Sequence, residues 1–95
     1  MYAVVRRYTS SSDLAATIRE KRGDLEQTMR GLPGFVAYYL VNAGDAVATV
    51  TVCQDRSGAE ASIRVAADWV RQNVPDAGLG VPEITQGEVL VDARP

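Results

Sequence analysis

The chain has 95 residues, 46% of them hydrophobic, and a formal net charge of −2. This length predicts one domain over residues 1–95, and this composition is typical of a globular protein and excludes a disordered one. The ten lysine and arginine residues are scattered, so no concentrated basic face for nucleic acid is expected. No apolar run has the length of a membrane span, and the first residues do not resemble a secretory signal. We therefore expect a cytoplasmic protein without nucleic-acid or membrane partners.

The sequence contains no histidine and a single cysteine, Cys53. Histidine is the commonest metal ligand, the usual general base and the usual axial ligand of haem. We therefore expect no metal site and no cofactor. One cysteine cannot form an intrachain disulfide, and without a histidine to activate it we expect Cys53 to be a small buried residue.

Residues 2–9 are rich in β-branched and aromatic side chains and are predicted to form a strand. A helix should follow, because residues 10–13 are of the types that cap helices. Apolar residues then recur at helical spacing on one stripe: Leu14, Ile18, Leu25 and Met29. Gly31 and Pro33 are expected to end this helix.

Residues 35–41 are predicted to form a second strand, and both faces of that strand are apolar. Residues 42–45 have the composition of a tight turn, and residues 46–54 read as a third strand. The two strands are therefore expected to form a hairpin. A strand covered on one side should be apolar on one face only, so the second apolar face also needs a cover.

Ser57 and Glu60 have the spacing of a capping box, which predicts the start of a second helix, and Pro75 should stop it. Its expected buried face consists of Ala59, Ile63, Ala66, Ala67, Val70 and Val74. Residues 83–93 are predicted to form the last strand. The resulting order is that of an α+β, ferredoxin-like βαββαβ fold, a four-stranded antiparallel sheet with two helices on one face.

The register of the strands predicts which side chains face the helices. The third strand has a more apolar row, which we expect to face them: Ala48, Val50 and Val52. A shift of 45 residues superimposes the two halves of the chain weakly and puts Ala3, Val5 and Arg7 on that same face. The other row of the first strand, with Tyr2, Val4, Arg6 and Tyr8, then points away from the helices. There Arg6 would need a partner such as Glu88 or Asp92.

The sheet face opposite the helices would be bare in a monomer. It carries part of the first strand and one apolar row of the second. Apolar patches of this kind are rare on monomers, and two-fold pairing is the commonest symmetry of assemblies. We therefore expect a homodimer in which a second copy covers this face.

Three segments carry a resemblance to a known group: GLPGFVAYYLV at 31–41, ATVTVCQD at 48–55 and AADWVRQNVP at 66–75. With this element order and length, the chain resembles the dimeric α+β barrel superfamily, nearest the antibiotic biosynthesis monooxygenase (ABM) family. The resemblance covers nearly the whole chain. It implies two sheets packed face to face into a dimeric α+β barrel, with the helices outside. It also implies one of several activities, among them cofactor-free oxygenation and haem degradation, and the missing histidine disfavours the latter.

The resemblance also implies a ligand site at Trp69, the only tryptophan, with Asn73 four residues later. Oxygenases of the family use a tryptophan here to hold a planar substrate between helices and sheet. The asparagine expected one turn before the tryptophan is absent, and Val65 stands in its place. Packing in the core is the alternative for Trp69, since an aromatic residue at helical spacing is usually core.

Three further residues are candidates for contact with a ligand. Arg7 would hold an anionic or enolate oxygen, or else extend to water from the strand end. Tyr38 and Tyr39 lie on opposite faces of their strand, so one should face the helices and the other the second subunit. Each is either a packing residue or a phenol that orients a ligand.

Two functions from different classes remain open, and no catalytic residue is assigned. In the first, a small planar organic molecule binds between the sheet and the second helix, and the protein acts as a cofactor-free monooxygenase. In the second, the protein is a non-enzymatic ligand-binding dimer, or a structural dimer whose cleft is filled by its own side chains. The absence of a matched acid–base pair favours the second class.

Overall fold

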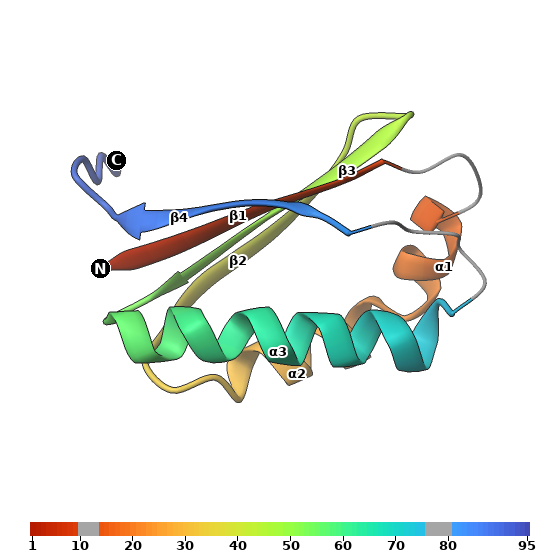
Figure 1. Cartoon of the computed structure of the whole chain (residues 1–95), viewed down its shortest axis with the longest axis horizontal. Coiled ribbons are helices and arrows are strands. Elements are labelled where there is room, and N and C mark those ends of the chain that lie inside the picture. Colours follow the sequence, from red (N-terminus) through yellow and green to blue (C-terminus); the bar gives the residue numbers. More distant parts are fainter. Residues whose placement is uncertain (10–13, 76–80) are drawn as a thin grey trace.

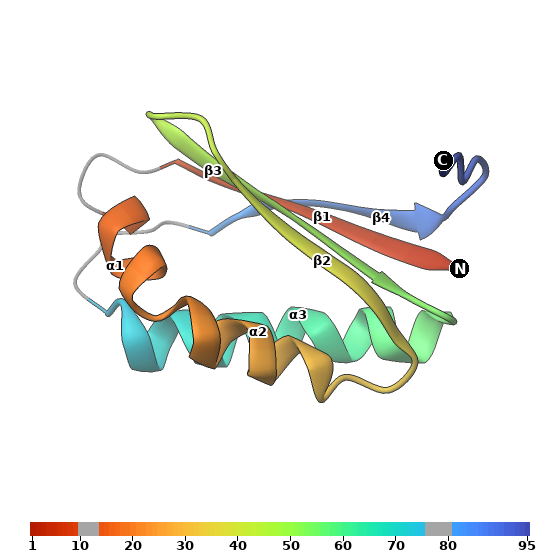
Figure 2. The same ribbon diagram turned by 180° about the vertical axis from the view of Figure 1, so that it is seen from behind.

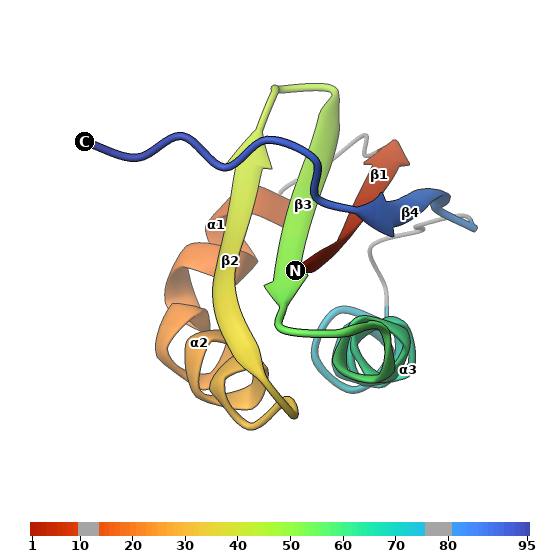
Figure 3. The same ribbon diagram turned by 90° about the vertical axis from the view of Figure 1, so that its left-hand side faces the viewer.

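The computed structural model describes residues 1–9, 14–75 and 81–95, and within these ranges four strands form one antiparallel sheet. The strands are β1 (Tyr2–Thr9), β2 (Phe35–Asn42), β3 (Ala46–Cys53) and β4 (Glu83–Glu88), in the spatial order β2-β3-β1-β4. The helices lie on one face of the sheet, as Figures 1 and 3 show. This arrangement confirms the predicted ferredoxin-like α+β fold. The predicted caps at 10–13 and most of the loop before β4 lie outside the described residues.

The first predicted helix is divided into two, α1 (Leu14–Glu20) and α2 (Arg22–Arg30), as Figure 2 shows. Lys21 separates them with φ −102° and ψ 15°, outside the helical range. The Lys21 amide still donates to the Thr17 carbonyl (3.0 Å), and its carbonyl accepts from the Leu25 amide (3.1 Å). The chain therefore changes direction at Lys21 while helical hydrogen bonds continue on both sides of it. Gly23, a weak helix former, lies just beyond the bend.

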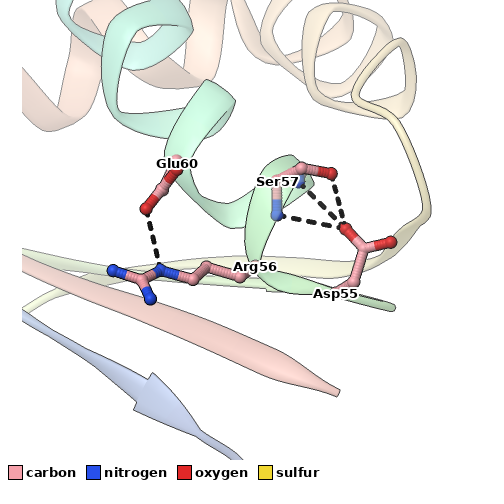
Figure 4. Close-up of polar contacts among 5 residues, drawn as sticks. Asp55, Arg56, Ser57 and Glu60 are labelled. Atoms are coloured by element: carbon pink, nitrogen blue, oxygen red, sulfur yellow. Dashed lines mark hydrogen bonds and ion pairs between the residues drawn. The ribbon is translucent and has the colours of Figure 1, made fainter.

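Helix α3 (Arg56–Asn73) begins at a different cap from the one predicted. Its N-cap is Asp55, whose Oδ1 accepts hydrogen bonds from the Ser57 amide (3.1 Å), the Ser57 hydroxyl (2.7 Å) and the Gly58 amide (3.3 Å). Glu60 does not reach back to the cap but pairs with Arg56 at 2.9 Å (Figure 4). The predicted Ser57–Glu60 capping box is therefore wrong, because the carboxylate of Asp55 already satisfies the free amides of the first turn.

The buried face of α3 is also rotated from the predicted one. It consists of Gly58, Ala59, Ser62, Ala66 and Trp69, whereas the predicted member Ala67 is exposed. Four of these five residues are small, and the large one, Trp69, lies in the C-terminal half of the helix. No helix among the described residues is both long and apolar enough to cross a membrane.

The last strand is shorter than predicted. β4 ends at Glu88, and residues 89–95 continue without regular structure. This segment is attached to the sheet through the Val89 amide, which donates to the Met1 carbonyl at 2.9 Å. Leu90 and Val91, expected in the strand, are highly exposed.

The predicted assignment of the sheet faces is wrong. The row of β3 that faces the helices is the semi-polar one: Thr49, Thr51 and Cys53, all at most 3% exposed. The matching row of β1 is Val4, Arg6 and Tyr8, which pair with that face in register. The more apolar row of β3 and the exposed Arg7 lie on the opposite side, called the open face below. The reason is that the hydroxyls of Thr49 and Thr51 accept hydrogen bonds from the buried side chain of Arg6. The semi-polar row can therefore lie on the face that the helices cover.

Candidate ligand-binding site

A buried arginine lies at the centre of the site. Arg6, in the middle of β1, is 1% exposed. Its Nε donates to Thr49 Oγ1 (3.2 Å), its Nη2 to Thr51 Oγ1 (3.0 Å) and its Nη1 to the Ser62 carbonyl of α3 (3.1 Å). The expectation that Arg6 faces away from the helices and pairs with Glu88 or Asp92 is therefore wrong. Arg6 instead joins β3 and α3 from the central strand.

The charge of Arg6 has no carboxylate partner among the residues that the structure describes. All three of its hydrogen-bond partners are neutral oxygen atoms. A buried charge is normally paired with an opposite charge, because hydrogen bonds to neutral groups replace only part of its hydration. The site therefore holds a positive charge that the described part of the fold leaves without a counter-ion.

Arg6 lines a small cavity between the sheet and the helices, called the Arg6 cavity below. Its volume is about 30 Å³, enough for about two water molecules. Its wall is mostly apolar, with Met29 and Ala66 from the helices and Leu40 from β2. The polar groups on the wall come from Arg6, Tyr8, Tyr38, Thr49 and Trp69.

A larger groove adjoins the Arg6 cavity at the edge of the sheet. This β2 groove, of about 480 Å³, lies between β2 and the two helices α1 and α2. Both spaces are bordered by the same four side chains: Ile18, Leu25, Tyr38 and Leu40. The groove also has Arg19, Arg22 and Glu26 on its wall. The cavity and the groove are therefore adjacent, with these four residues on the border of both.

Trp69 serves the core and the cavity together. It is 5% exposed and belongs to the main hydrophobic cluster with Leu25 and Met29, which confirms the packing interpretation. Its indole Nε1 donates to Asp24 Oδ2 of α2 at 2.8 Å. Asp24 thereby orients the ring that lines the cavity.

The two neighbouring tyrosines of β2 lie on opposite faces, as predicted. Tyr38 faces the helices and lines the Arg6 cavity, whereas Tyr39 lies on the open face and is 63% exposed. Burial raises the pKa of Tyr38, and the nearby charge of Arg6 offsets part of that rise. Burial likewise raises the pKa of Tyr8, against the smaller opposite effect of Arg6. Both phenols therefore stay protonated at neutral pH and are hydrogen-bond donors.

Two other predicted site residues do not line the Arg6 cavity. The Asn73 side chain donates from Nδ2 to the Trp69 carbonyl (2.9 Å), and the Asn73 main-chain carbonyl accepts from Lys21 Nζ (3.0 Å). These contacts hold Asn73 at the C-terminal end of α3. Arg7 is exposed on the open face, because adjacent residues of a strand point to opposite sides. The role predicted for Arg7 depended on the wrong face assignment. The signal that identifies Arg6 is the row of threonine hydroxyls opposite it in β3.

Cys53 is fully buried, as expected, and burial raises the pKa of its thiol. It therefore stays protonated and packs as a small apolar residue. Among the described residues, no group of three or more histidine, cysteine, aspartate or glutamate side chains is arranged to hold a metal ion.

The sheet order and the helices on one face define a ferredoxin-like α+β protein, and the Arg6 cavity lies between its layers. Several solved structures share this fold over nearly the whole chain. A protein of unknown function from Nitrosomonas europaea, NE2512, matches with TM-score 0.75 and 16% identity, over 99% of this chain and 93% of its own. The resemblance to ABM proteins is confirmed at the level of the fold by two further structures.

The first of these is SnoaB, a cofactor-independent oxygenase from Streptomyces nogalater (TM-score 0.65, 17% identity, 96% of this chain and 94% of its own). The second is the ActVA-Orf6 monooxygenase of Streptomyces coelicolor, solved with the ligand Nanaomycin D (TM-score 0.69, 13% identity, 99% and 91%). No family model matches the chain, and no curated protein matches it in sequence. At these identities the likeness concerns the fold and not the activity.

Proposed function

We propose that the protein binds a small planar organic molecule at the Arg6 cavity and the β2 groove and acts on it as a cofactor-free monooxygenase. The observation that carries the proposal is the buried Arg6 beside the ring of Trp69 and the phenol of Tyr38, in one cavity. The fold supports it as well, since structures with the same fold include a cofactor-independent oxygenase and a monooxygenase with a bound ligand.

The chemistry of the proposal assigns the reactivity to the substrate. An electron-rich phenol with a ring CH₂ group reacts with oxygen once it has lost a proton. One oxygen atom enters the substrate as a carbonyl, and the other leaves as water with the two hydrogens of the CH₂. Arg6 stabilises the phenolate by its charge, and the neutral phenols of Tyr8 and Tyr38 donate hydrogen bonds. Among the described residues no carboxylate lines the Arg6 cavity, so the proton leaves to water.

The size of the cavity restricts how such a substrate fits. About 30 Å³ holds the oxygen-bearing edge of a ring but not the ring itself. The ring therefore takes the adjoining β2 groove, and Tyr38 and Leu40, which border both spaces, shift to admit it.

The second function, a non-enzymatic binding or structural dimer, is favoured by the same small volume. Trp69 and Met29 are buried in the main hydrophobic cluster and line the Arg6 cavity. A protein of this class would give no turnover. In a binding dimer a ligand would still raise the melting temperature, because it stabilises only the native state.

The proposal is tested by incubating the purified protein with a panel of dihydroanthracenone-type phenols and following quinone absorbance. We expect turnover with at least one member, reduced strongly by Trp69→Phe and by Arg6→Lys. Arg64→Gln, an exposed arginine of α3 that lines neither the cavity nor the groove, is the control that keeps full activity. An unchanged spectrum across the panel, or full activity of Trp69→Phe with any substrate, contradicts the proposal.

The proposed active form is a homodimer joined through the open face. Val5, Tyr39 and Val41 are 39%, 63% and 52% exposed there, around the row of alanine and valine from β3. Burying a face of some hundreds of Å² per subunit contributes on the order of 10 kcal/mol before the costs of association. A second copy therefore accounts for the apolar residues that the helices do not cover.

A further inference from the structure

The charges around the proposed site are unbalanced. Arg6 lacks a carboxylate partner among the described residues, and its three hydrogen bonds end on neutral oxygens. In the β2 groove, Arg22 Nε is 3.9 Å from Glu26 Oε1, whereas Arg19 has no ion pair among the described residues. The chain has a formal net charge of −2, yet this region is positive.

The arrangement of these charges follows the shape of the site. Arg6 lies on the cavity, whose volume of about 30 Å³ holds about two water molecules and so admits a group of one or two oxygen atoms. Arg19 and Arg22 lie on the open groove, where exposed positive charge attracts anions from solution. An anion at Arg6 would supply the counter-charge that the buried guanidinium lacks.

We infer that the ligand of this site is an aromatic monoanion that binds in its charged form. Its anionic oxygen group occupies the Arg6 cavity, and its ring lies in the β2 groove beside Tyr38 and Leu40. This inference rests on the proposed binding site but not on the oxygenase reaction. It assigns the recognition of charge to Arg6 and the attraction of the ligand to Arg19.

The test compares two probes of nearly equal shape, para-fluorobenzoate and para-fluorobenzamide, by fluorine NMR titration of the intact protein at neutral pH. We expect the anion to bind about tenfold or more tightly than the neutral amide, a difference that one desolvated charge contact accounts for. Raising the salt concentration should weaken the binding of the anion and leave that of the amide unchanged.

Three variants locate the contact. Arg6→Met should bring the affinity for the anion down to that of the amide, whereas Arg64→Gln, an exposed arginine of α3 outside both the cavity and the groove, should change neither. Arg19→Gln should reduce the salt dependence and keep most of the preference. If Arg6→Met does not fold, as circular dichroism would show, the comparison of the two probes on the unmodified protein decides alone.

The outcomes separate this inference from the proposed function. Equal affinity for the two probes, or an undiminished preference in folded Arg6→Met, overturns the inference. If a neutral phenol is nevertheless converted to quinone, the proposed function stands although the inference about an anionic ligand is overturned. If no probe and no phenol of the panel binds, both are overturned. A clear preference for the anion without any turnover supports the inference and contradicts the oxygenase reaction.

Discussion

Arg6 and Arg7 are adjacent in sequence, yet their surroundings are opposite. Arg6 is buried at the centre of the sheet with three hydrogen bonds, and Arg7 is exposed on the open face. The alternation of a strand makes the difference inevitable but does not say which of the two is inside. The threonine row of β3 decides it, because its hydroxyls can satisfy a buried guanidinium and the valine row cannot.

Trp69 depends on one polar contact outside its own helix, the hydrogen bond from its indole to Asp24. Asp24→Ala leaves a nearly buried N–H without its acceptor, and we expect it to lower the free energy of unfolding by about 1 kcal/mol. Urea unfolding followed by the emission of this single tryptophan measures the loss. Asp24→Asn, which keeps an oxygen acceptor, is the control and should lose much less. Equal stability of Asp24→Ala and the unmodified protein would show that the contact is not stabilising.

At the level of the element, the N-terminal turn of α3 combines a cap with a close approach to the rest of the chain. Asp55 holds the first amides, and Gly58 lies against Pro33 and Cys53. A Cβ built on Gly58 would come to 2.1 Å from the Pro33 carbonyl oxygen and 3.0 Å from Cys53 Cβ. Only glycine permits this distance between the helix, β3 and the loop before β2.

Gly58→Ala should therefore destabilise the protein. The overpacking costs about 1–3 kcal/mol, which exceeds the gain in helix propensity of about 1 kcal/mol at most. Gly23→Ala is the matched control, since Gly23 lies in the first turn of α2 and has nothing within 4 Å of a built Cβ. It should raise stability by up to about 1 kcal/mol. Thermal unfolding of the two variants gives the comparison, and a stable Gly58→Ala would contradict the close approach.

The cap of α3 should make stability depend on pH. The hydroxyl of Ser57 and the amide of Gly58 hold the pKa of the Asp55 carboxyl below its ordinary value of about 4. The pKa of Asp55 is lower in the native protein than in the unfolded chain. The charged carboxylate therefore stabilises the protein at pH values above its ordinary pKa. This stabilisation is lost as the pH falls through the native pKa.

Asp55→Asn retains a capping oxygen but has no charge to lose. The difference in melting temperature between the unmodified protein and Asp55→Asn should therefore be largest above about pH 5 and shrink below about pH 4. Thermal unfolding followed by circular dichroism at several pH values measures it. A difference that does not change with pH would mean that the hydrogen bonds do not favour the charged form.

On the scale of the whole molecule, the sheet is asymmetric: one face is covered by helices and the open face is not. The proposed homodimer makes a direct prediction. Val5→Glu puts a charge at the middle of the open face, and we expect it to convert the dimer to a monomer at micromolar concentration in light scattering. Ala67→Glu, an exposed change of the same kind on α3, should leave the dimer intact. An unmodified protein that is monomeric at this concentration would contradict the dimer.

Much of the fold was predictable from local sequence alone. The type and order of the elements follow from periodicity and turn residues, which act over a few positions. Residues 2–9 and 35–41 were predicted as strands, and the end of α3 before Pro75 agrees within two residues. The opposite directions of Tyr38 and Tyr39 were also predicted correctly, and core packing of Trp69 was one of the two interpretations that the sequence left open.

The tertiary structure alone decided how these elements face one another. Alternation along a strand fits either face equally well, so the apolarity of Ala48, Val50 and Val52 pointed to the wrong side. A buried Arg6 is tolerable only because Thr49, Thr51 and the Ser62 carbonyl meet it from distant parts of the chain. The sequence by itself thus determined the layout of the sheet and helices. The site was decided by contacts between residues more than 40 positions apart, which no local pattern records.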